Sequence, residues 1–276
     1  MIIGWEWLYE GFFVIGIAAC VFFVLPRIMK RYDMSKKAND FYTILTLIAI
    51  AAGIGGAILF QLIYDLFEYG FKLPSGYSPG MTFLGGLIVG AAAFLIGTRF
   101  VAKPEVRKEF WIILRCIAPC VCIAHAFGRI GCLFGGCCYG IEMDGFPGIW
   151  FPAGSNAANH LNGGAAVCVL PTQLFEAVFL FILFYVCYRF NEKSLITYLI
   201  SYGVFRFIIE FFRADHRGEL LWQTALSPSQ VLSIGMVILG VVLLILDIKK
   251  KGILIRPDPP EKKPEDMEPK PAEAQA

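Results

Sequence analysis

The densest group of side chains that could do chemistry lies in residues 125–140. This run holds one histidine, one arginine and three cysteines among five glycines, in a chain that is otherwise largely apolar. His125 and Arg129 are four residues apart, so on a helix they share one face. The glycines indicate that this helix breaks into a tight loop, because glycine adopts backbone conformations that other residues avoid. The remaining reactive side chains lie on or beside that loop: Cys132, Cys137 and Cys138.

A second group of charges lies within the apolar segment 194–213. Arg206 and Glu210 are four residues apart and Glu210 and Arg213 are three apart, so all three share one helix face. A charge at membrane depth costs several kcal/mol unless it is paired or hydrated. Two arginines for one carboxylate leave positive charge that suits a phosphate, which a guanidinium binds with two hydrogen bonds. The alternative is a structural ion-pair ladder between helices.

Two further polar residues favour the phosphate interpretation. Gln173 and Glu176 begin another apolar segment directly after Pro171, where Glu176 can complete the arginine network. Arg129 is a plausible second phosphate contact. The ligand expected for such a site within a bilayer is a phospholipid head group.

The composition predicts a membrane protein. Of the 276 residues, 57% are hydrophobic and only 17% are charged, and the mean hydropathy is +0.65. A soluble domain carries about a quarter charged residues. The net charge of +2 gives no strongly basic surface, which argues against nucleic acid as a partner.

We expect an all-α, polytopic bundle of about seven transmembrane helices with a re-entrant or irregular outer loop. Each span needs about 20 apolar residues. The segments that satisfy this requirement are 7–26, 41–63, 83–101, 110–128, 171–190, 194–213 and 228–247. The loop 129–170 is rich in Pro, Gly and Asn, which is typical of irregular structure.

The distribution of basic residues predicts the orientation. Loops after the odd-numbered spans are rich in Lys and Arg, and those after the even-numbered spans are poor in them. The positive-inside rule then places the N-terminus outside and the C-terminus in the cytoplasm. We expect a transmembrane domain over 1–248 and a disordered cytoplasmic tail over 249–276, whose Pro, Glu, Lys and Ala cannot form a packed core.

Four stretches together resemble the prolipoprotein diacylglyceryl transferase family. They are Gly80–Leu87, which opens the third span; Gly128–Gly131, which begins the family signature; Pro171–Glu176; and Arg206–Arg213 with its Arg-x3-Glu-x2-Arg spacing. The resemblance runs over roughly residues 5–250. About seven spans and an outer N-terminus agree with it.

The resemblance implies an activity and a set of roles. Family members move the diacylglyceryl group of phosphatidylglycerol onto the thiol of a lipobox cysteine in a secreted precursor and release glycerol phosphate. Arg129 and Arg206 match the functional arginines of the family, and Glu210 and Arg213 match its supporting network. Arginines would stabilise the charge that develops on the departing phosphate. The implied location is the plasma membrane of a bacterium.

The chain departs from the family pattern at its reactive positions. The family usually has histidine where this chain has Leu84, and leucine cannot accept a proton. In the signature, Cys132 and Gly135 replace two asparagines and Cys137 replaces a glutamate. The usual candidate base is therefore absent, and sulfur replaces a polar anchor.

The cysteines admit four interpretations. Cys137 near Arg129 could act as a thiolate base, since nearby cations lower a thiol pKa. The cluster could instead form a redox pair, or bind a metal together with His125, although adjacent cysteines suit tetrahedral geometry poorly. The fourth interpretation is that small residues pack a narrowed pocket.

We predict diacylglyceryl transfer from a phospholipid donor to a secreted-protein precursor, without a cofactor or metal. The expected catalytic residues are Arg129, Arg206 and Cys137. The expected substrate contacts are Arg213, Glu210, Glu176, Gln173 and His125. The alternatives are a related phospholipid-dependent transferase with another acceptor, and a membrane thiol oxidoreductase or metal-binding protein that uses Cys132–Cys138.

Overall fold

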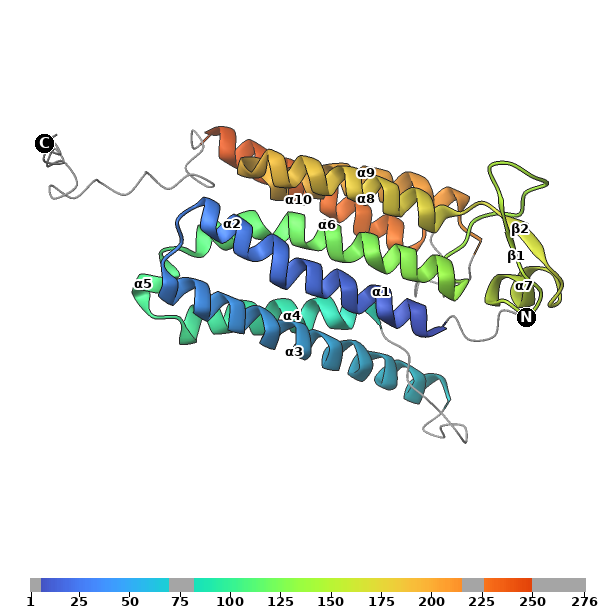
Figure 1. Ribbon diagram of the computed structural model, residues 1–276, viewed down its shortest axis with the longest axis horizontal. Coiled ribbons are helices and arrows are strands. Elements are labelled where there is room, and N and C mark those ends of the chain that lie inside the picture. Colours follow the sequence, from blue (N-terminus) through green and yellow to red (C-terminus); the bar gives the residue numbers. More distant parts are fainter. Residues whose placement is uncertain (1–5, 70–81, 215–225, 250–276) are drawn as a thin grey trace, which may run out of the picture.

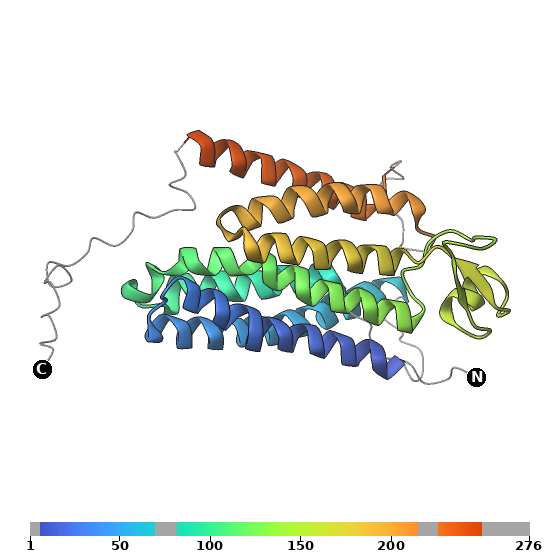
Figure 2. The same cartoon turned by 45° about the horizontal axis from the view of Figure 1, so that its top comes forward.

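The computed structural model describes residues 6–69, 82–214 and 226–249. The predicted tail after 249 and the first two residues of the Gly80–Leu87 stretch lie outside these ranges. The described part is mainly helical, and its helices lie side by side in a bundle (Figures 1 and 2).

The N-terminal half consists mainly of long helices. A first helical run consists of α1 (Glu6–Ala18), a π-helical segment (Ala19–Val24) and α2 (Leu25–Arg31). It is followed by α3 (Lys36–Glu68), α4 (Phe83–Ile96) with a π-helical end (Gly97–Val101), the single turn α5 (Pro104–Arg107) and α6 (Phe110–Gly135).

A small mixed unit separates α6 from the C-terminal helices. It contains β1 (Ile149–Phe151), α7 (Asn156–Leu161) and β2 (Val167–Val169), and the two strands pair antiparallel with Trp150 opposite Cys168. The chain continues into α8 (Thr172–Arg189), a 3-10 turn (Asn191–Lys193), α9 (Ser194–Ile209), a second 3-10 turn (Glu210–Phe212) and α10 (Pro228–Lys249). The predicted outer loop is therefore partly regular, a feature that its Pro, Gly and Asn content did not reveal.

Helix α6 is the centre of the bundle. It packs against α1 and α8 and also contacts α9, while α3 pairs with α4 and α9 pairs with α10. The β1–α7–β2 unit lies at the end of the bundle where α6 ends and α8 begins, and α10 ends at the opposite end (Figure 1). Side chains from the ends of α6, α8 and α9 therefore meet beside this unit.

The prediction of an all-α polytopic membrane protein is confirmed, but its count of seven spans is not. Among the described residues, six helices are long and apolar enough to cross a bilayer, and Gly85–Val101 is a shorter apolar helix. Large apolar side chains such as Phe22, Phe100 and Ile248 are exposed on the outer surface of the bundle. Such a surface suits lipid, because a soluble monomer rarely exposes large apolar patches.

The prediction that α6 ends near residue 128 is wrong by about two turns. The helix continues to Gly135, so Cys132 lies within its last turn, beside the loop. A Cβ at Gly131 would lie 3.0 Å from the carbonyl oxygen of Tyr9 in α1, so this glycine serves close helix packing. The helix breaks only at Gly136, whose φ of 65° lies in the left-handed region that ends many helices.

Candidate active site

Glu176, in the second turn of α8, is the centre of a buried polar network. Its carboxylate is fully buried, and Oε2 lies 3.0 Å from Arg129 Nε and 3.8 Å from Arg213 Nη1. Its other oxygen accepts a 2.7 Å hydrogen bond from the hydroxyl of Tyr202 and lies 3.7 Å from His125 Nε2. Four side chains from α6, α9 and the segment after α9 therefore converge on one carboxylate.

His125 and Arg129 share one face of α6, as their spacing predicts. Arg129 Nε donates a 3.2 Å hydrogen bond to His125 Nε2, so this ring nitrogen acts as an acceptor and is unprotonated. The imidazole also meets the ring of Tyr202 edge-on at 5.3 Å. His125 thus helps to hold Arg129 in place beside Glu176.

A second ion pair joins Arg206, one helical turn after Tyr202 in α9, to Glu210. Arg206 Nη1 is 2.8 Å from Glu210 Oε2, and Arg206 Nη2 donates a 3.0 Å hydrogen bond to Ser229 Oγ. Ser227 Oγ donates a 2.8 Å hydrogen bond to Glu210 Oε1. The start of α10 therefore holds this pair from the other side.

Two residues at the start of α8 hold the loop that follows α6. The hydroxyl of Thr172 donates a 2.7 Å hydrogen bond to the carbonyl of Cys138, and Gln173 Nε2 donates one of 2.7 Å to the carbonyl of Cys137. Gln173 is fully buried, and among the described residues its Oε1 has no hydrogen-bond partner. Gln173 thus supports the cysteine loop through its side-chain amide, and its Oε1 is an unused hydrogen-bond acceptor among the described residues.

Backbone hydrogen bonds join the three chain segments that carry the site. The amide of Gly140 donates to Leu170, ahead of α8, and the amide of Ile141 donates to Phe212, beside Arg213. A Cβ at Gly140 would lie 2.6 Å from the Phe212 carbonyl oxygen and 2.8 Å from that of Leu170. Only glycine lets these segments approach so closely.

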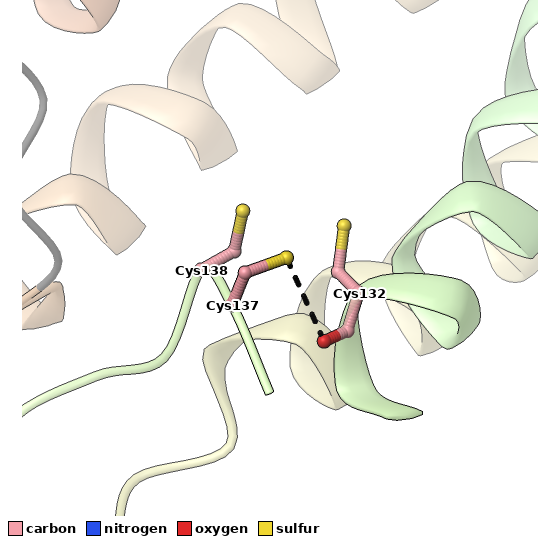
Figure 3. A group of neighbouring side chains, drawn as sticks. All are labelled: Cys132, Cys137 and Cys138. Carbon is pink, nitrogen blue, oxygen red and sulfur yellow. Dashed lines mark hydrogen bonds between the residues drawn. The ribbon is translucent and has the colours of Figure 1, made fainter. Parts of the chain in front are cut away.

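The three cysteines of the loop form one cluster beside this network. The Sγ atoms of Cys132, Cys137 and Cys138 all lie within 4.8 Å of one another (Figure 3). Hydrogen bonds from the Cys132 and Cys137 thiols hold the pKa of Cys138 below its ordinary value, and Arg129 and Arg213 act in the same direction. The Cys132 and Cys138 thiols, together with burial, raise the pKa of Cys137. The pKa of Cys138 is therefore shifted in the opposite direction to that of Cys137.

The structure brings most of the predicted site residues together at one end of the bundle. Arg129, Glu176, His125 and Arg213 form one network, and Arg206 with Glu210 forms the adjoining pair. Gln173 reaches the cysteine loop. Leu84 lies in the first turn of α4.

Sequence reasoning missed four polar residues that support the site. They are Tyr202, which precedes Arg206 by one helical turn; Thr172, which begins α8; Ser227, which directly precedes α10; and Ser229, which lies in its first turn. The position of Tyr202 four residues before Arg206 was a usable signal, because residues i and i+4 share a face. Serine is common at the start of a helix, so residue type alone did not mark Ser227 and Ser229 as part of the site.

Fold and site together define a polytopic membrane protein with buried arginines held by carboxylates at one end of its bundle. Residues 7–246 match the family of prolipoprotein diacylglyceryl transferases. The chain belongs to this family.

Relatives of similar length agree with this assignment. Phosphatidylglycerol–prolipoprotein diacylglyceryl transferase 2 of Clostridium perfringens is 33% identical over 252 residues, which cover 86% of this chain and 90% of the relative. The transferase of Streptococcus uberis is 32% identical and covers 81% of this chain and 85% of its own length. The transferase of Mannheimia succiniciproducens is 31% identical, and the match covers 72% of this chain and 73% of the relative.

Proposed function

We propose that this protein moves the diacylglyceryl group of phosphatidylglycerol to the thiol of a cysteine in a prolipoprotein. The observation that carries this proposal is the convergence of the family motifs on one buried network. Arg129 from the signature and Glu176 from the Pro171 stretch lie 3.0 Å apart, and Arg213 from the Arg206–Arg213 stretch lies 3.8 Å from the same carboxylate. The names of the relatives supply the donor and the kind of acceptor.

The arginines are suited to the phosphate of the donor. In the reaction, the acceptor sulfur attacks the glyceryl carbon that carries the phosphate ester; a carbon–sulfur bond forms and the carbon–oxygen bond breaks. The electron pair leaves with the phosphate oxygen, so negative charge grows on glycerol phosphate. Arg206 and Arg129 would stabilise this charge, because guanidinium groups held in a low-dielectric site bind it strongly.

The carboxylates position these arginines. Glu176 contacts Arg129 at Nε and not at the outer nitrogens of the guanidinium, which face a ligand in this proposal. Glu210 holds Arg206 differently, through the outer nitrogen Nη1, while Nη2 donates to Ser229. Preorganised donors of this kind require little rearrangement when the transition-state charge appears. We therefore assign Glu176, Glu210, Arg213 and His125 to positioning and substrate contact.

The experiment is transfer by the purified full chain in phosphatidylglycerol nanodiscs. The acceptor is a lipobox peptide with a free cysteine, and the products are the lipidated peptide and glycerol phosphate. Arg206→Lys keeps a charge beside Glu210 but loses the two-pronged geometry. We expect Arg206→Lys and Arg129→Lys to lower transfer by about 10²–10³-fold, the usual loss for one such donor.

Two controls make the result specific. Arg99→Ala removes an exposed arginine from the π-helical segment that precedes α5, the turn at the opposite end of the bundle (Figure 1), and should leave transfer unchanged. A peptide with serine in place of its cysteine should receive no lipid. Full transfer by both Lys variants would refute the phosphate role of the arginines, and lipid release without thioether formation would refute the acceptor.

A further inference from the structure

The three thiols of Cys132, Cys137 and Cys138 are arranged as a ligand set. Their sulfurs lie on a common side of the loop, with Cys137 Sγ directed toward Cys132 (Figure 3). All three lie within 4.8 Å of one another. Zinc–sulfur bonds of about 2.3 Å in a tetrahedron place the sulfurs about 3.8 Å apart. Small side-chain rotations are therefore enough to bring all three onto one ion.

The backbone is shaped to present these thiols. Adjacent residues in an extended chain point to opposite sides, which would separate Cys137 from Cys138. Here Gly136 and Cys138 both have φ of 65°, and this turn brings both thiols back toward Cys132. Left-handed backbone is unfavourable for cysteine, and such strain is concentrated at functional sites. Packing alone would be served by glycine at position 138, which adopts this backbone conformation freely.

The supports of the cluster resemble those of a metal site. Thr172 and Gln173 bind the carbonyls of Cys138 and Cys137 at 2.7 Å each, so the loop is fixed from α8. Hydrogen bonds around the ligands are what orient them in metal sites. Arg129 and Arg213 belong to the Glu176 network beside the cluster, so their charge would offset that of three thiolates on a divalent ion.

The cluster is partly exposed and lies next to the candidate active site. Each of the three cysteines is partly exposed, whereas Cys116, Cys122, Cys168 and Cys187 are buried. Cys132 lies three residues after Arg129 and seven after His125, on the same face of α6. A ligand that completes the three thiolates would therefore approach beside the arginines that bind the donor phosphate.

We propose that Cys132, Cys137 and Cys138 bind one Zn²⁺ ion whose fourth position takes the thiol of the acceptor. This inference rests on the proposed function and supplies what its chemistry lacks. Leucine at position 84 cannot remove the proton of the acceptor thiol. Zinc deprotonates a coordinated thiol outright, and catalytic zinc sites keep three protein ligands and one open position.

The step balances without a redox partner. The acceptor thiol gives its proton to water as its sulfur binds the ion. The zinc-bound thiolate attacks the glyceryl carbon, the carbon–oxygen bond breaks, and its electron pair leaves on glycerol phosphate beside Arg129 and Arg206. The product is a neutral thioether, a weaker ligand than thiolate, so it leaves the ion and reopens the fourth position.

Cobalt provides a test that does not depend on transfer. Full-length protein, purified without oxygen in detergent and freed of metal, is titrated with Co²⁺ alone. Three thiolates should give one equivalent of tetrahedral Co²⁺ with intense sulfur-to-cobalt absorption, and Zn²⁺ should displace it. A lipobox peptide with free cysteine should change the visible bands, and its serine counterpart should not.

Variants locate the site. Cys132→Ser and Cys138→Ser should each abolish the thiolate–cobalt absorption, while Cys20→Ser, which changes a partly exposed cysteine elsewhere, should keep it. Thermal unfolding of each variant in detergent verifies that it is folded. Co²⁺ absorption that persists in both cluster variants, or a disulfide within the cluster of the freshly purified protein, would overturn the metal site.

Transfer assays separate this inference from the proposed function. Removal of metal should lower transfer by roughly 10²-fold or more, and Zn²⁺ should restore it. Full transfer by metal-free protein would overturn the zinc site and leave the proposed function standing. Peptide-dependent cobalt bands without any lipidated peptide would support the site and overturn the proposed function.

Discussion

At the scale of single residues, Glu176 is the side chain on which the arrangement of the arginines depends. A fully buried carboxylate is tolerated only when cations and hydrogen bonds compensate for its lost hydration. Here Arg129 and Arg213 supply the charge and Tyr202 supplies the hydroxyl. Each partner removed should therefore weaken both the fold and the position of the arginines.

Tyr202→Phe tests this dependence. The variant keeps the ring that meets His125 and removes only the 2.7 Å hydrogen bond to Glu176. We expect a loss of stability of about 1–3 kcal/mol, because a buried acceptor loses its donor, together with slower transfer. Tyr198→Phe is the matched control, since its ring stacks on Tyr202. Both variants are measured by thermal unfolding in detergent. Equal losses of stability would contradict a specific role for the hydrogen bond from Tyr202 to Glu176.

Glycine and alanine substitutions should have opposite effects on stability at Cys138 and at Cys132, because the two residues differ in backbone conformation. At Cys138, with φ of 65°, glycine should be more stable than alanine by about 1 kcal/mol, since only glycine adopts this region freely. At Cys132, inside α6, the order should reverse, with glycine less stable than alanine by about 0.5–1 kcal/mol. Unfolding of the four variants in detergent measures both differences. The same sign at both positions would exclude the left-handed conformation of Cys138.

At the scale of elements, α3 and α4 approach each other through glycines. A Cβ at Gly56 would lie 2.5 Å from the Cβ of Val89, and one at Gly85 would lie 2.5 Å from the Cβ of Phe60. Small residues at such positions let membrane helices come close enough for dense packing and weak backbone contacts. This pair therefore associates through its glycine face.

Gly56→Ala should force the two helices apart. Overpacking of this kind costs about 1–3 kcal/mol, because Val89 is part of the facing helix and cannot rotate away. Gly55→Ala is the matched control on the next residue of α3, where an added Cβ meets nothing within 4 Å. It should be neutral or stabilising, since alanine favours helix. The measurement is thermal unfolding of both variants in the same detergent, and equal losses would contradict the glycine interface.

The helices and the shared faces of spaced residues could be predicted from the sequence, whereas the tertiary contacts that assemble the site could not. Apolar length predicted the spans, and i,i+4 spacing placed Arg206 and Glu210 on one face. Helix α6 extends to Gly135, and Gly131 within this extension packs closely against Tyr9, far away in the sequence, so local glycine content suggested a break too early. The meeting of the three thiols depends on the φ of Cys138, a conformation that residue type does not favour.

At the scale of the whole molecule, the two ends of the bundle differ in charge. The end with the β1–α7–β2 unit holds the arginines that pair with Glu176 and Glu210, together with the cysteine cluster, and Figure 2 shows this unit at one end of the bundle. The opposite end carries exposed basic residues such as Lys36, which begins α3, and Lys103, which precedes α5. Basic residues beside membrane spans are retained on the cytoplasmic side. The site end should then face outward, where secreted precursors arrive.

Labelling of introduced cysteines in intact cells tests this orientation. In a Cys132→Ser, Cys137→Ser and Cys138→Ser background, Asp144→Cys lies exposed at the site end and Lys103→Cys lies exposed at the opposite end. A membrane-impermeant maleimide should label position 144 in intact cells and position 103 only after permeabilisation. The reverse pattern would place the site in the cytoplasm, where a secreted precursor could not meet it after export. Labelling of both positions after permeabilisation is the internal control for reactivity, so a position that fails there is replaced by another exposed residue at the same end.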